Sequence, residues 1–423
     1  MVYLLYGLGI GNLSIQKYFD LNKIDYVIYD DNQDNDDFKM NDIKLIIKSS
    51  GIANNTPLIL SALEKNIEIV TDLEFFYRLY YPEDLICVTG SNGKTTVTSL
   101  LKEVLKEEGY EVCGNIGIPI FDKIYLNKAK LIIEASSYML EYTKHFKPHI
   151  MIILNLEKHH LDHHQTFVNY IKAKIKALKN MNEYDVIIYP QDNILLDRII
   201  KVYNVNRLSF SVKDDLADCY LKDDFIYYDK KRIIDVNKLH LVGTHNIQNI
   251  MVTLLTLHSL KINFQDHLET LYNFLPLSHR LENIYPNHSN SALFINDSKS
   301  TNIHSLEVAI KTIIEKYINK KYYLIVGGTN INQDYSVIKK YEKVFTKIYF
   351  YGDAGKRYAN ILNKEEECFN KLENLLNILL KESFTEDDVI LFSPGAPSYG
   401  EFKSYIERGN YFKMIIMKNQ ATN

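Results

Sequence analysis

A glycine-rich turn between a predicted strand and a predicted helix is the feature of this chain best suited to chemistry. The apolar run 84–88 leads into Thr89-Gly-Ser-Asn-Gly-Lys-Thr-Thr96, and a helical pattern follows over 97–105. The backbone N–H groups of such a loop and the start of the helix form a site for phosphate. Lys94 can reach the β- and γ-phosphates, and the Thr95 hydroxyl can bind Mg²⁺. The turn therefore predicts a nucleoside-triphosphate site made by Gly90, Ser91, Asn92, Gly93, Lys94, Thr95 and Thr96.

This turn departs from the general phosphate-binding loop, which has four residues between its two glycines. Only two residues separate Gly90 from Gly93, and Val88 stands where the first glycine is expected. A tight strand–helix connection without a ligand is the alternative. It is disfavoured because Gly-Lys-Thr-Thr directly after an apolar strand is hard to explain by turn chemistry alone.

Two later strand ends carry possible metal ligands. Glu134 follows the predicted strand 131–133, and open α/β sheets bind ligands at the carboxyl ends of their strands. A carboxylate there can coordinate Mg²⁺ beside the phosphates, although a charge at a helix N-terminus is the alternative. The segment 155–164 ends the next predicted strand and contains His159, His160, His163 and His164.

The histidine-rich segment leaves two interpretations open. Zinc binding is one, but no second cluster of Cys or His lies at zinc-finger spacing. A solvated polar loop is the other. Lys174, on the amphipathic segment 167–178, has by itself the character of a surface lysine.

Polar turns recur in the second half of the chain. The segment 243–249 opens a predicted helix with Asn246 and Asn249, for which helix capping is the alternative role. Arg280 supplies a fork-shaped cation suited to phosphate. The turn 296–302 follows a predicted strand and groups Asp297, Lys299 and Thr301, while 392–398 ends another strand with small residues and donors.

Composition places the chain among ordinary globular proteins. Its 423 residues, 46% hydrophobic and 24% charged, suffice for two or three domains. A net charge of −4 gives no general attraction to nucleic acid or acidic membranes. The four cysteines lack disulfide or zinc spacing. We expect a reduced, cytoplasmic protein, because no secretory leader or bilayer-spanning run is found, and we also expect a monomer.

Alternating strands and helices predict three α/β domains: 1–81, 82–277 and 278–423. The first opens with Gly7-Leu-Gly9 between the strands 3–6 and 26–29, an incomplete dinucleotide fingerprint for which a plain turn is an equal alternative. The second holds the glycine-rich turn, and its segment 213–238 is polar and irregular. The third contains predicted strands at 293–295, 322–326, 347–351 and 388–392.

These motifs together resemble the Mur ligase family, over the whole length and in order. The matching segments are Thr89–Thr96, Gly114-Asn-Ile-Gly117, Glu134-Ala-Ser-Ser137, His160-Leu-Asp162, Gly243-Thr-His-Asn246, His279-Arg280, Asn296-Asp-Ser-Lys299 and Gly327-Gly328. The resemblance implies an N-terminal Rossmann-like domain, a central P-loop ATPase domain and a C-terminal Rossmann-like domain. It also implies an ATP-dependent ligase of cell-wall synthesis that joins an amino acid to a carboxylate through an acyl phosphate. The forms of 114–117, 296–302 and 393–398 resemble the members that add D-glutamate to UDP-MurNAc-L-Ala.

The resemblance also implies roles for particular residues. Two Mg²⁺ ions would be held by Thr95, Glu134, His160 and a carbamylated Lys174, with Lys94, Lys174 and His160 catalytic. Further ATP contacts would come from Asn246, Asn249, Arg280 and Asp297. Substrate contacts would come from Gly7, Leu8, Gly9, Asp30, Gly51, Asn115, Ser136, Lys299, Thr301, Ser398 and Tyr399.

The chain departs from the family pattern in three places. His159 replaces an aspartate before the metal histidine, Ile331 replaces a lysine that contacts the amino-acid carboxylate, and Asp31-Asn32 with Gly11-Asn12 alter the uridine region. Alternative readings are another Mur-type ligase, a folylpolyglutamate-type ligase, and a non-catalytic nucleotide-binding switch or scaffold. We expect small-molecule substrates, with neither nucleic acid nor membrane insertion.

Overall fold

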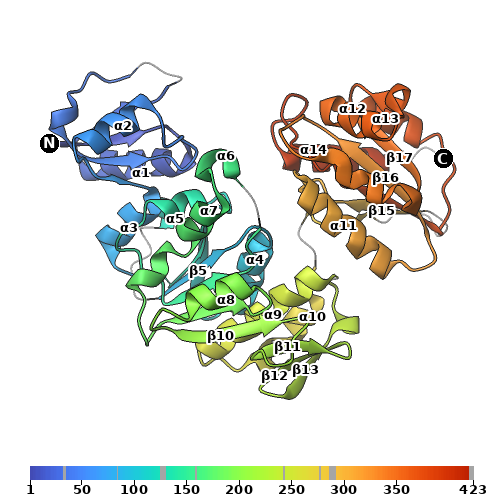
Figure 1. Ribbon diagram of the computed structural model, residues 1–423, viewed down its shortest axis with the longest axis horizontal. Helices are drawn as coiled ribbons and strands as arrows, with labels where there is room; N and C mark the ends of the chain where they lie inside the picture. Colours follow the sequence, from blue (N-terminus) through green and yellow to red (C-terminus); the bar gives the residue numbers. More distant parts are fainter. Residues whose placement is uncertain are drawn as a thin grey trace. The chain divides into compact units, whose positions relative to one another are not determined.

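Three largely parallel sheets flanked by helices make up the computed structural model (Figure 1). It describes residues 1–31, 35–82, 84–123, 130–157, 160–241, 243–275, 278–284 and 292–418. These pack as two compact units, one of Met1–Leu239 with Thr244–Phe274, the other of His240–Gly243 with Leu275–Asn423. The predicted α/β class is confirmed.

The first sheet has the strand order β2-β1-β3-β4 and is parallel throughout. Because side chains alternate along a strand, Leu5 and Ile47 pack toward α1 and α3, while Leu4 and Ile46 pack toward α2. The elements are β1 (Val2–Tyr6), α1 (Ile10–Asn22), β2 (Tyr26–Tyr29), β3 (Ile43–Lys48), α2 (Pro57–Glu64), β4 (Ile69–Val70) and α3 (Asp72–Tyr80).

One continuous core joins this sheet to the next. The aromatic rings of Phe75 and Phe121 stack with centroids 5.6 Å apart, and the same core reaches Leu85 and Cys87 on β5. Burial of apolar surface across the connection explains why residues 1–81 and the following domain pack as one unit. The boundary predicted at residue 81 stays a prediction, and it lies inside this unit.

The second sheet has nine strands in the order β13-β12-β11-β10-β9-β8-β5-β7-β6. β5 lies between β7 and β8, so the glycine-rich turn after β5 has strand ends on both sides. Its strands are β5 (Leu85–Thr89), β6 (Tyr110–Gly114), β7 (Lys130–Glu134), β8 (Ile150–Ile153), β9 (Val186–Pro190), β10 (Asn206–Ser211), β11 (Cys219–Lys222), β12 (Phe225–Tyr228) and β13 (Lys231–Asp235). The helices are α4 (Lys94–Val104), α5 (Ser137–Glu141), α6 (Leu161–His164), α7 (Phe167–Lys174), α8 (Ile194–Ile200), α9 (Thr244–Ser259) and α10 (Leu268–Asn273).

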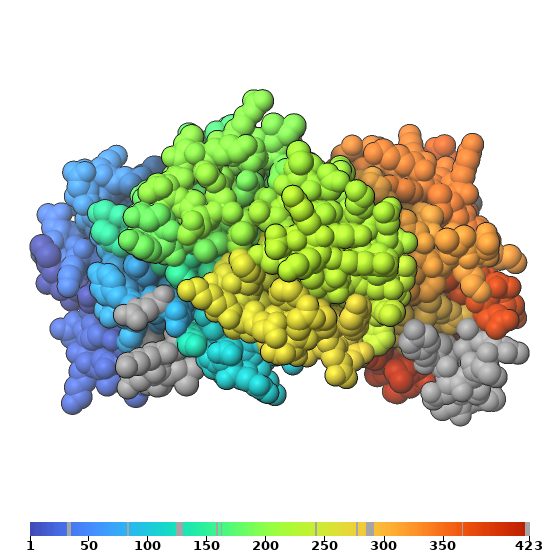
Figure 2. All heavy atoms as spheres, turned by 90° about the horizontal axis from the view of Figure 1, so that it is seen from below, coloured from blue at the N-terminus to red at the C-terminus, as the bar shows by residue number. Residues whose placement is uncertain are grey.

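The segment 213–238, whose sequence is polar and less regular, contains three strands that the sequence analysis did not predict. β11, β12 and β13 are antiparallel neighbours joined by two-residue turns. Both turns, Asp223-Asp224 and Asp229-Lys230, have positive φ at both residues, as tight hairpins require. Their sequences lack the glycine that usually marks such turns. The strands lie at the surface of the first unit (Figure 2, yellow-green).

The second unit contains one six-stranded sheet in the order β14-β15-β19-β16-β17-β18. All its pairs are parallel except β14 with β15. Its strands are β14 (Glu282–Ile284), β15 (Leu293–Asn296), β16 (Lys321–Gly327), β17 (Phe345–Tyr351), β18 (Cys368–Phe369) and β19 (Asp388–Phe392), and its helices are α11 (Ile303–Lys316), α12 (Gly352–Ile361), α13 (Leu372–Leu379) and α14 (Tyr405–Lys418). The predicted strands of this region are confirmed.

Candidate active site

The glycine-rich turn adopts a conformation that only glycine accepts easily at two positions. Gly90 and Gly93 have φ of +152° and +86°. A Cβ on Gly93 would lie 2.9 Å from Oδ1 of Asn249 on α9. Asn249 in turn donates from Nδ2 to Oδ1 of Asn246 at 3.0 Å. The structure therefore places Asn249 against the turn and holds Asn246 beside it. The pair thus does more than cap a helix.

Asn155, at the end of the neighbouring strand β8, fixes the backbone of the turn. Its backbone oxygen accepts from Ser91 N at 3.0 Å, and its side-chain oxygen accepts from Asn92 N at 2.8 Å. Its Nδ2 donates to the Asn92 carbonyl at 3.0 Å. Sequence reasoning gave Asn155 no role. The sequence places Asn155 at a strand end, but only the structure shows that this strand neighbours β5 in the sheet.

Two lysines converge on one carbonyl of the turn. Lys94 Nζ donates to the oxygens of Gly90 and Ser91 at 2.9 and 3.0 Å. Lys174 Nζ donates to the same Gly90 oxygen at 2.8 Å and to Thr89 Oγ1 at 3.1 Å. Lys174 is 2% exposed, so the description of it as a surface lysine is wrong. The pKa of Lys174 lies well below its ordinary value; burial is the largest cause, and the positive charge of Lys94 is the second.

Glu134, at the end of β7, presents a carboxylate oxygen that no group of the described chain satisfies. The side chain is 2% exposed. Oε1 accepts from Asn115 Nδ2 at 3.1 Å, whereas Oε2 is buried without a hydrogen-bond partner. A buried carboxylate oxygen is costly unless a cation or donor meets it. The donor set fits Mg²⁺, a hard cation that takes carboxylate oxygen and keeps part of its water shell.

The histidine-rich segment divides into two groups. His160 takes a left-handed conformation (φ +52°) just before α6, and its ring lies 5.0 Å from that of Tyr138. His163 Nε2 lies 2.7 Å from Glu141 Oε2, and one ligand atom each of Glu141, His163 and His164 lies within 4.8 Å of the others. The third member of this group, the Glu141 carboxylate, comes from α5. The spacing of the histidines alone therefore did not predict it. Lys158 and His159 lie outside the described residues.

Near the first sheet, a cavity of about 320 Å³ brings together most of the predicted nucleotide-sugar contacts. Asn12, whose identity departs from the family, is buried and donates from Nδ2 to the carbonyls of Tyr6, Gly7 and Ile47. Asp31 Oδ2 accepts from the Tyr6 hydroxyl at 3.3 Å, and Asn32 lies outside the described residues. Ser136 caps α5 by accepting from Met139 N at 3.2 Å. The predicted contacts that line the cavity are Gly7, Leu8, Gly9, Asp30, Gly51 and Asn115.

In the second unit, Arg408 holds two predicted motifs together. Its guanidinium is fully buried and donates to Ser298 Oγ and O at 3.0 and 2.7 Å, and to the carbonyls of Ala396 and Pro397 at 3.0 and 3.1 Å. Asp297, in the same turn as Ser298, accepts from Ser393 Oγ at 2.8 Å. Burial raises the pKa of Asp297 to about 7, against the lowering by its hydrogen bonds and by Arg280 and Arg408.

The predicted amino-acid contacts lie on loops of this unit. Lys299 Nζ stands 3.8 Å above the ring of Tyr405, a residue that sequence reasoning did not select. Ser398 is buried and Thr301 is half-buried, whereas Tyr399 is 68% exposed. The second unit therefore holds Arg280, Asp297, Lys299, Thr301, Ser398 and Tyr399 on its own loops, and the remaining predicted residues belong to the first unit.

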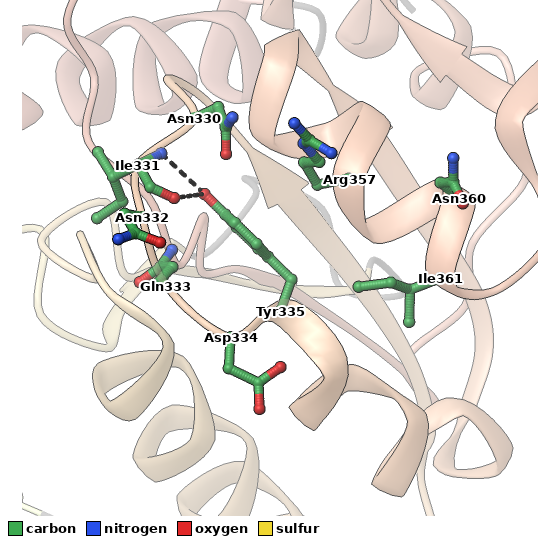
Figure 3. Close-up of a pocket in the computed structure, with 9 residues that line it drawn as sticks. All are labelled: Asn330, Ile331, Asn332, Gln333, Asp334, Tyr335, Arg357, Asn360 and Ile361. Atoms are coloured by element: carbon green, nitrogen blue, oxygen red, sulfur yellow. Dashed lines mark hydrogen bonds between the residues drawn. The ribbon is translucent and has the colours of Figure 1, made fainter.

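Ile331, the residue in place of an expected lysine, lines a cavity of about 550 Å³ (Figure 3). Its backbone N–H donates to the Tyr335 hydroxyl at 3.1 Å, which fixes the loop after β16. Arg357, from α12, lines the same cavity across from Ile331. A cation is thus present in this cavity although the expected lysine is not.

Comparison with known proteins places these features in a family. The Mur ligase middle domain model matches residues 88–257. The UDP-N-acetylmuramoylalanine–D-glutamate ligase of Buchnera aphidicola subsp. Schizaphis graminum is 30% identical, covering 97% of this chain and 96% of the relative. The ligase of the same name from Fusobacterium nucleatum is 31% identical, covering 98% of both chains. The chain belongs to the Mur ligase family.

A solved Mur ligase structure has the same fold. The MurF ligase from Thermotoga maritima, determined in complex with ADP, superposes with a TM-score of 0.65 at 17% identity, covering 99% of this chain and 95% of that one. The three-domain Mur ligase architecture predicted from the sequence is confirmed. In the described part of the chain, no helix is long and apolar enough to cross a bilayer.

Proposed function

We propose that this chain joins D-glutamate to UDP-MurNAc-L-alanine with hydrolysis of ATP, in the cytoplasmic stage of peptidoglycan synthesis. Two observations support it. The relatives that match nearly the whole chain carry this activity in their name. Lys94 on the glycine-rich turn and the unsatisfied Glu134 oxygen at the end of the neighbouring strand β7 offer the ammonium and the metal ligand with which phosphoryl transfer neutralises charge.

The first step of the proposed reaction transfers the γ-phosphoryl group. The terminal carboxylate of the alanyl substrate attacks the γ-phosphorus, the bond to the β-phosphate oxygen breaks, and ADP leaves with that electron pair. The turn's N–H groups and the Lys94 ammonium stabilise the charge that spreads over the phosphoryl oxygens. Mg²⁺ supplies further charge neutralisation when bound, and Thr95, Glu134, His160 and carbamylated Lys174 would hold its two ions.

In the second step the neutral amino group of D-glutamate attacks the acyl carbon. The tetrahedral intermediate then expels inorganic phosphate and loses one proton from nitrogen, which leaves the amide. Lys299, Thr301, Ser398 and Tyr399 are the proposed contacts for the amino acid, and Arg357 is a further candidate because it shares a cavity with Ile331. Arg280 and Asp297 are proposed to complete the ATP site with Asn246 and Asn249.

The surroundings of Lys174 support the proposal that it is carbamylated. A carbamate forms when a neutral amine attacks CO₂ and releases a proton. Burial and the Lys94 charge lower the pKa of Lys174, so a larger fraction of its amine is neutral than for an exposed lysine. The resulting anion would relieve the repulsion from Lys94 and offer oxygen ligands to a metal.

The decisive experiment measures phosphate release by the purified chain with ATP, Mg²⁺ and UDP-MurNAc-L-alanine while the amino acid is varied. We expect release that depends on D-glutamate and much less with L-glutamate, L-lysine or diaminopimelate. Release with another amino acid alone would point to a different Mur-type ligase, and a folate acceptor would point to the folylpolyglutamate reaction. No release with any pair, despite ATP binding, would favour a nucleotide-binding scaffold.

A further inference from the structure

Lys48 is a buried cation that the reaction described above does not use. It is the last residue of β3 and is 1% exposed. Its Nζ has no hydrogen-bond partner in the described part of the chain and stands 5.1 Å from the ring of Tyr142. A buried ammonium without an acceptor is costly, so its retention here calls for an acceptor that the described part of the chain does not provide.

Lys48 lines the 320 Å³ cavity beside the first sheet. Among the described residues that line this cavity it is the one cation, and Asp30 and Asp72 are the acids. Without Lys48 the charged side chains described in this wall would all be acids. Burial lowers the pKa of Lys48 to about 8, while the charge of Glu141 raises it, so an arriving anion would favour the charged form further.

The position of the cavity in the fold indicates which anion it takes. α1, a helix of 13 residues, begins at the cavity with Gly9 as its N-cap, without a capping side chain and without an acid in its first turn. Helix N-termini at the carboxyl edge of a parallel sheet bind phosphate. Ser49, Ser50 and Gly51 continue the wall directly from Lys48.

We propose that Lys48 binds the diphosphate of the uridine-diphosphate sugar in this cavity. The inference rests on the proposed function and adds a specificity-determining residue to it. One ammonium then meets both needs of the site. It offsets the two carboxylates of the wall, and it finds in the ligand the acceptor that the described residues do not supply.

The test compares UDP with uridine, which differ by the diphosphate alone. Calorimetric titration of the full chain gives both affinities for the wild type, for K48M and for K48Q. The matched control is K44M, because Lys44 is an exposed lysine on the same strand. A hydrogen bond between charged groups corresponds to about tenfold or more in affinity. We expect K48M and K48Q to bind UDP at least about tenfold more weakly while their uridine affinity stays within about twofold, and K44M to change neither.

Equal losses for UDP and uridine would show that Lys48 only supports the cavity, and unchanged UDP affinity would show that it makes no contact; either overturns the proposal. In turnover, K48Q should raise KM for UDP-MurNAc-L-alanine while kcat and the KM for ATP stay within about threefold. The titrations need no turnover. A wild type that binds UDP but ligates no D-glutamate would refute the proposed function alone, whereas an active wild type with an unchanged UDP-to-uridine ratio in K48M would refute Lys48 alone.

Discussion

Lys94 and Lys174 donate hydrogen bonds to the same acceptor, the carbonyl oxygen of Gly90, at 2.9 and 2.8 Å. Two ammonium groups that share one oxygen repel each other, and Lys174 is also buried. The pair therefore favours an arrangement in which one amine is neutral or modified while the other keeps its charge for phosphate. Because Lys94 begins α4 directly after the glycine-rich turn, it is the one placed to meet phosphate.

Replacing Lys94 by Ala should abolish ligation without unfolding the chain. Its ammonium is the main side-chain charge directed at the transferred phosphoryl group, and removal of one such group typically costs about 100-fold or more in kcat. Steady-state phosphate release measures the effect, and circular dichroism with the melting temperature monitors the fold. Lys102→Ala, an exposed position on the same helix, serves as the control. Activity of Lys94→Ala within tenfold of wild type would contradict the assignment.

Lys174→Ala should be nearly inactive and should regain part of its activity with acetate or another short carboxylate. The added anion would take the place of the carbamate near the metal. Lys172→Ala, exposed on the same helix α7, should keep full activity and show no response to acetate. Full activity of Lys174→Ala without any added acid would rule out the carbamate.

Asp297→Asn should change how stability depends on pH. The folded-state pKa of Asp297 is raised to about 7, above the value near 4 expected in the unfolded chain. Below about pH 4 the carboxyl is protonated in both states, so it adds nothing to the pH dependence of the unfolding free energy. Between about pH 4 and 7 the folded state binds more protons, so the contribution of this group to stability falls as pH rises.

The melting temperature of Asp297→Asn relative to wild type should therefore rise between pH 5 and pH 8. Asp353→Asn, at an exposed position of the same unit, should show a constant difference. A difference for Asp297→Asn that stays constant, or that falls over this range, would mean that the carboxyl is already ionised in the folded chain at pH 5.

Ile331→Lys should lower KM for D-glutamate and leave KM for ATP nearly unchanged. A lysine would add a charge-assisted contact, worth about 1.5–3 kcal/mol when partly buried. If Arg357 in the same cavity already supplies a cation, Arg357→Gln should raise the D-glutamate KM in the wild-type background, and Ile331→Lys should restore it. An unaltered or higher KM for Ile331→Lys would show that this cavity does not bind the amino acid.

Arg408→Met should destabilise the second unit by about 2–4 kcal/mol and raise KM for D-glutamate. Met has similar length, but it leaves the carbonyls of Ser298, Ala396 and Pro397 without their buried donor. Chemical denaturation reports the loss of stability. Arg357→Met, exposed on α12, controls for the loss of an arginine in the stability measurement only. Wild-type stability of Arg408→Met would show that water replaces the guanidinium.

Local sequence determined much of the architecture. The strands 26–29 and 388–392 were predicted at their observed bounds, because short apolar runs between turn residues leave few other structures open. The glycine-rich turn was found for a similar reason, since its phosphate-binding geometry is built from consecutive residues. The strands of 219–235 were missed because their hairpin turns use Asp and Lys at positions of positive φ, where glycine and asparagine are the usual signals.

Tertiary structure alone decided which distant side chains meet. Nothing in the spacing of the chain shows that Lys174 lies 2.8 Å from the Gly90 carbonyl, that Asn155 fixes the glycine-rich turn, or that Arg408 joins two loops of the second unit. The burial of Lys48 beside a cavity wall with two acids also depends on the packing of separate segments. Local propensity acts over a few residues, whereas the desolvation and electrostatics that give these groups their chemistry depend on everything packed around them.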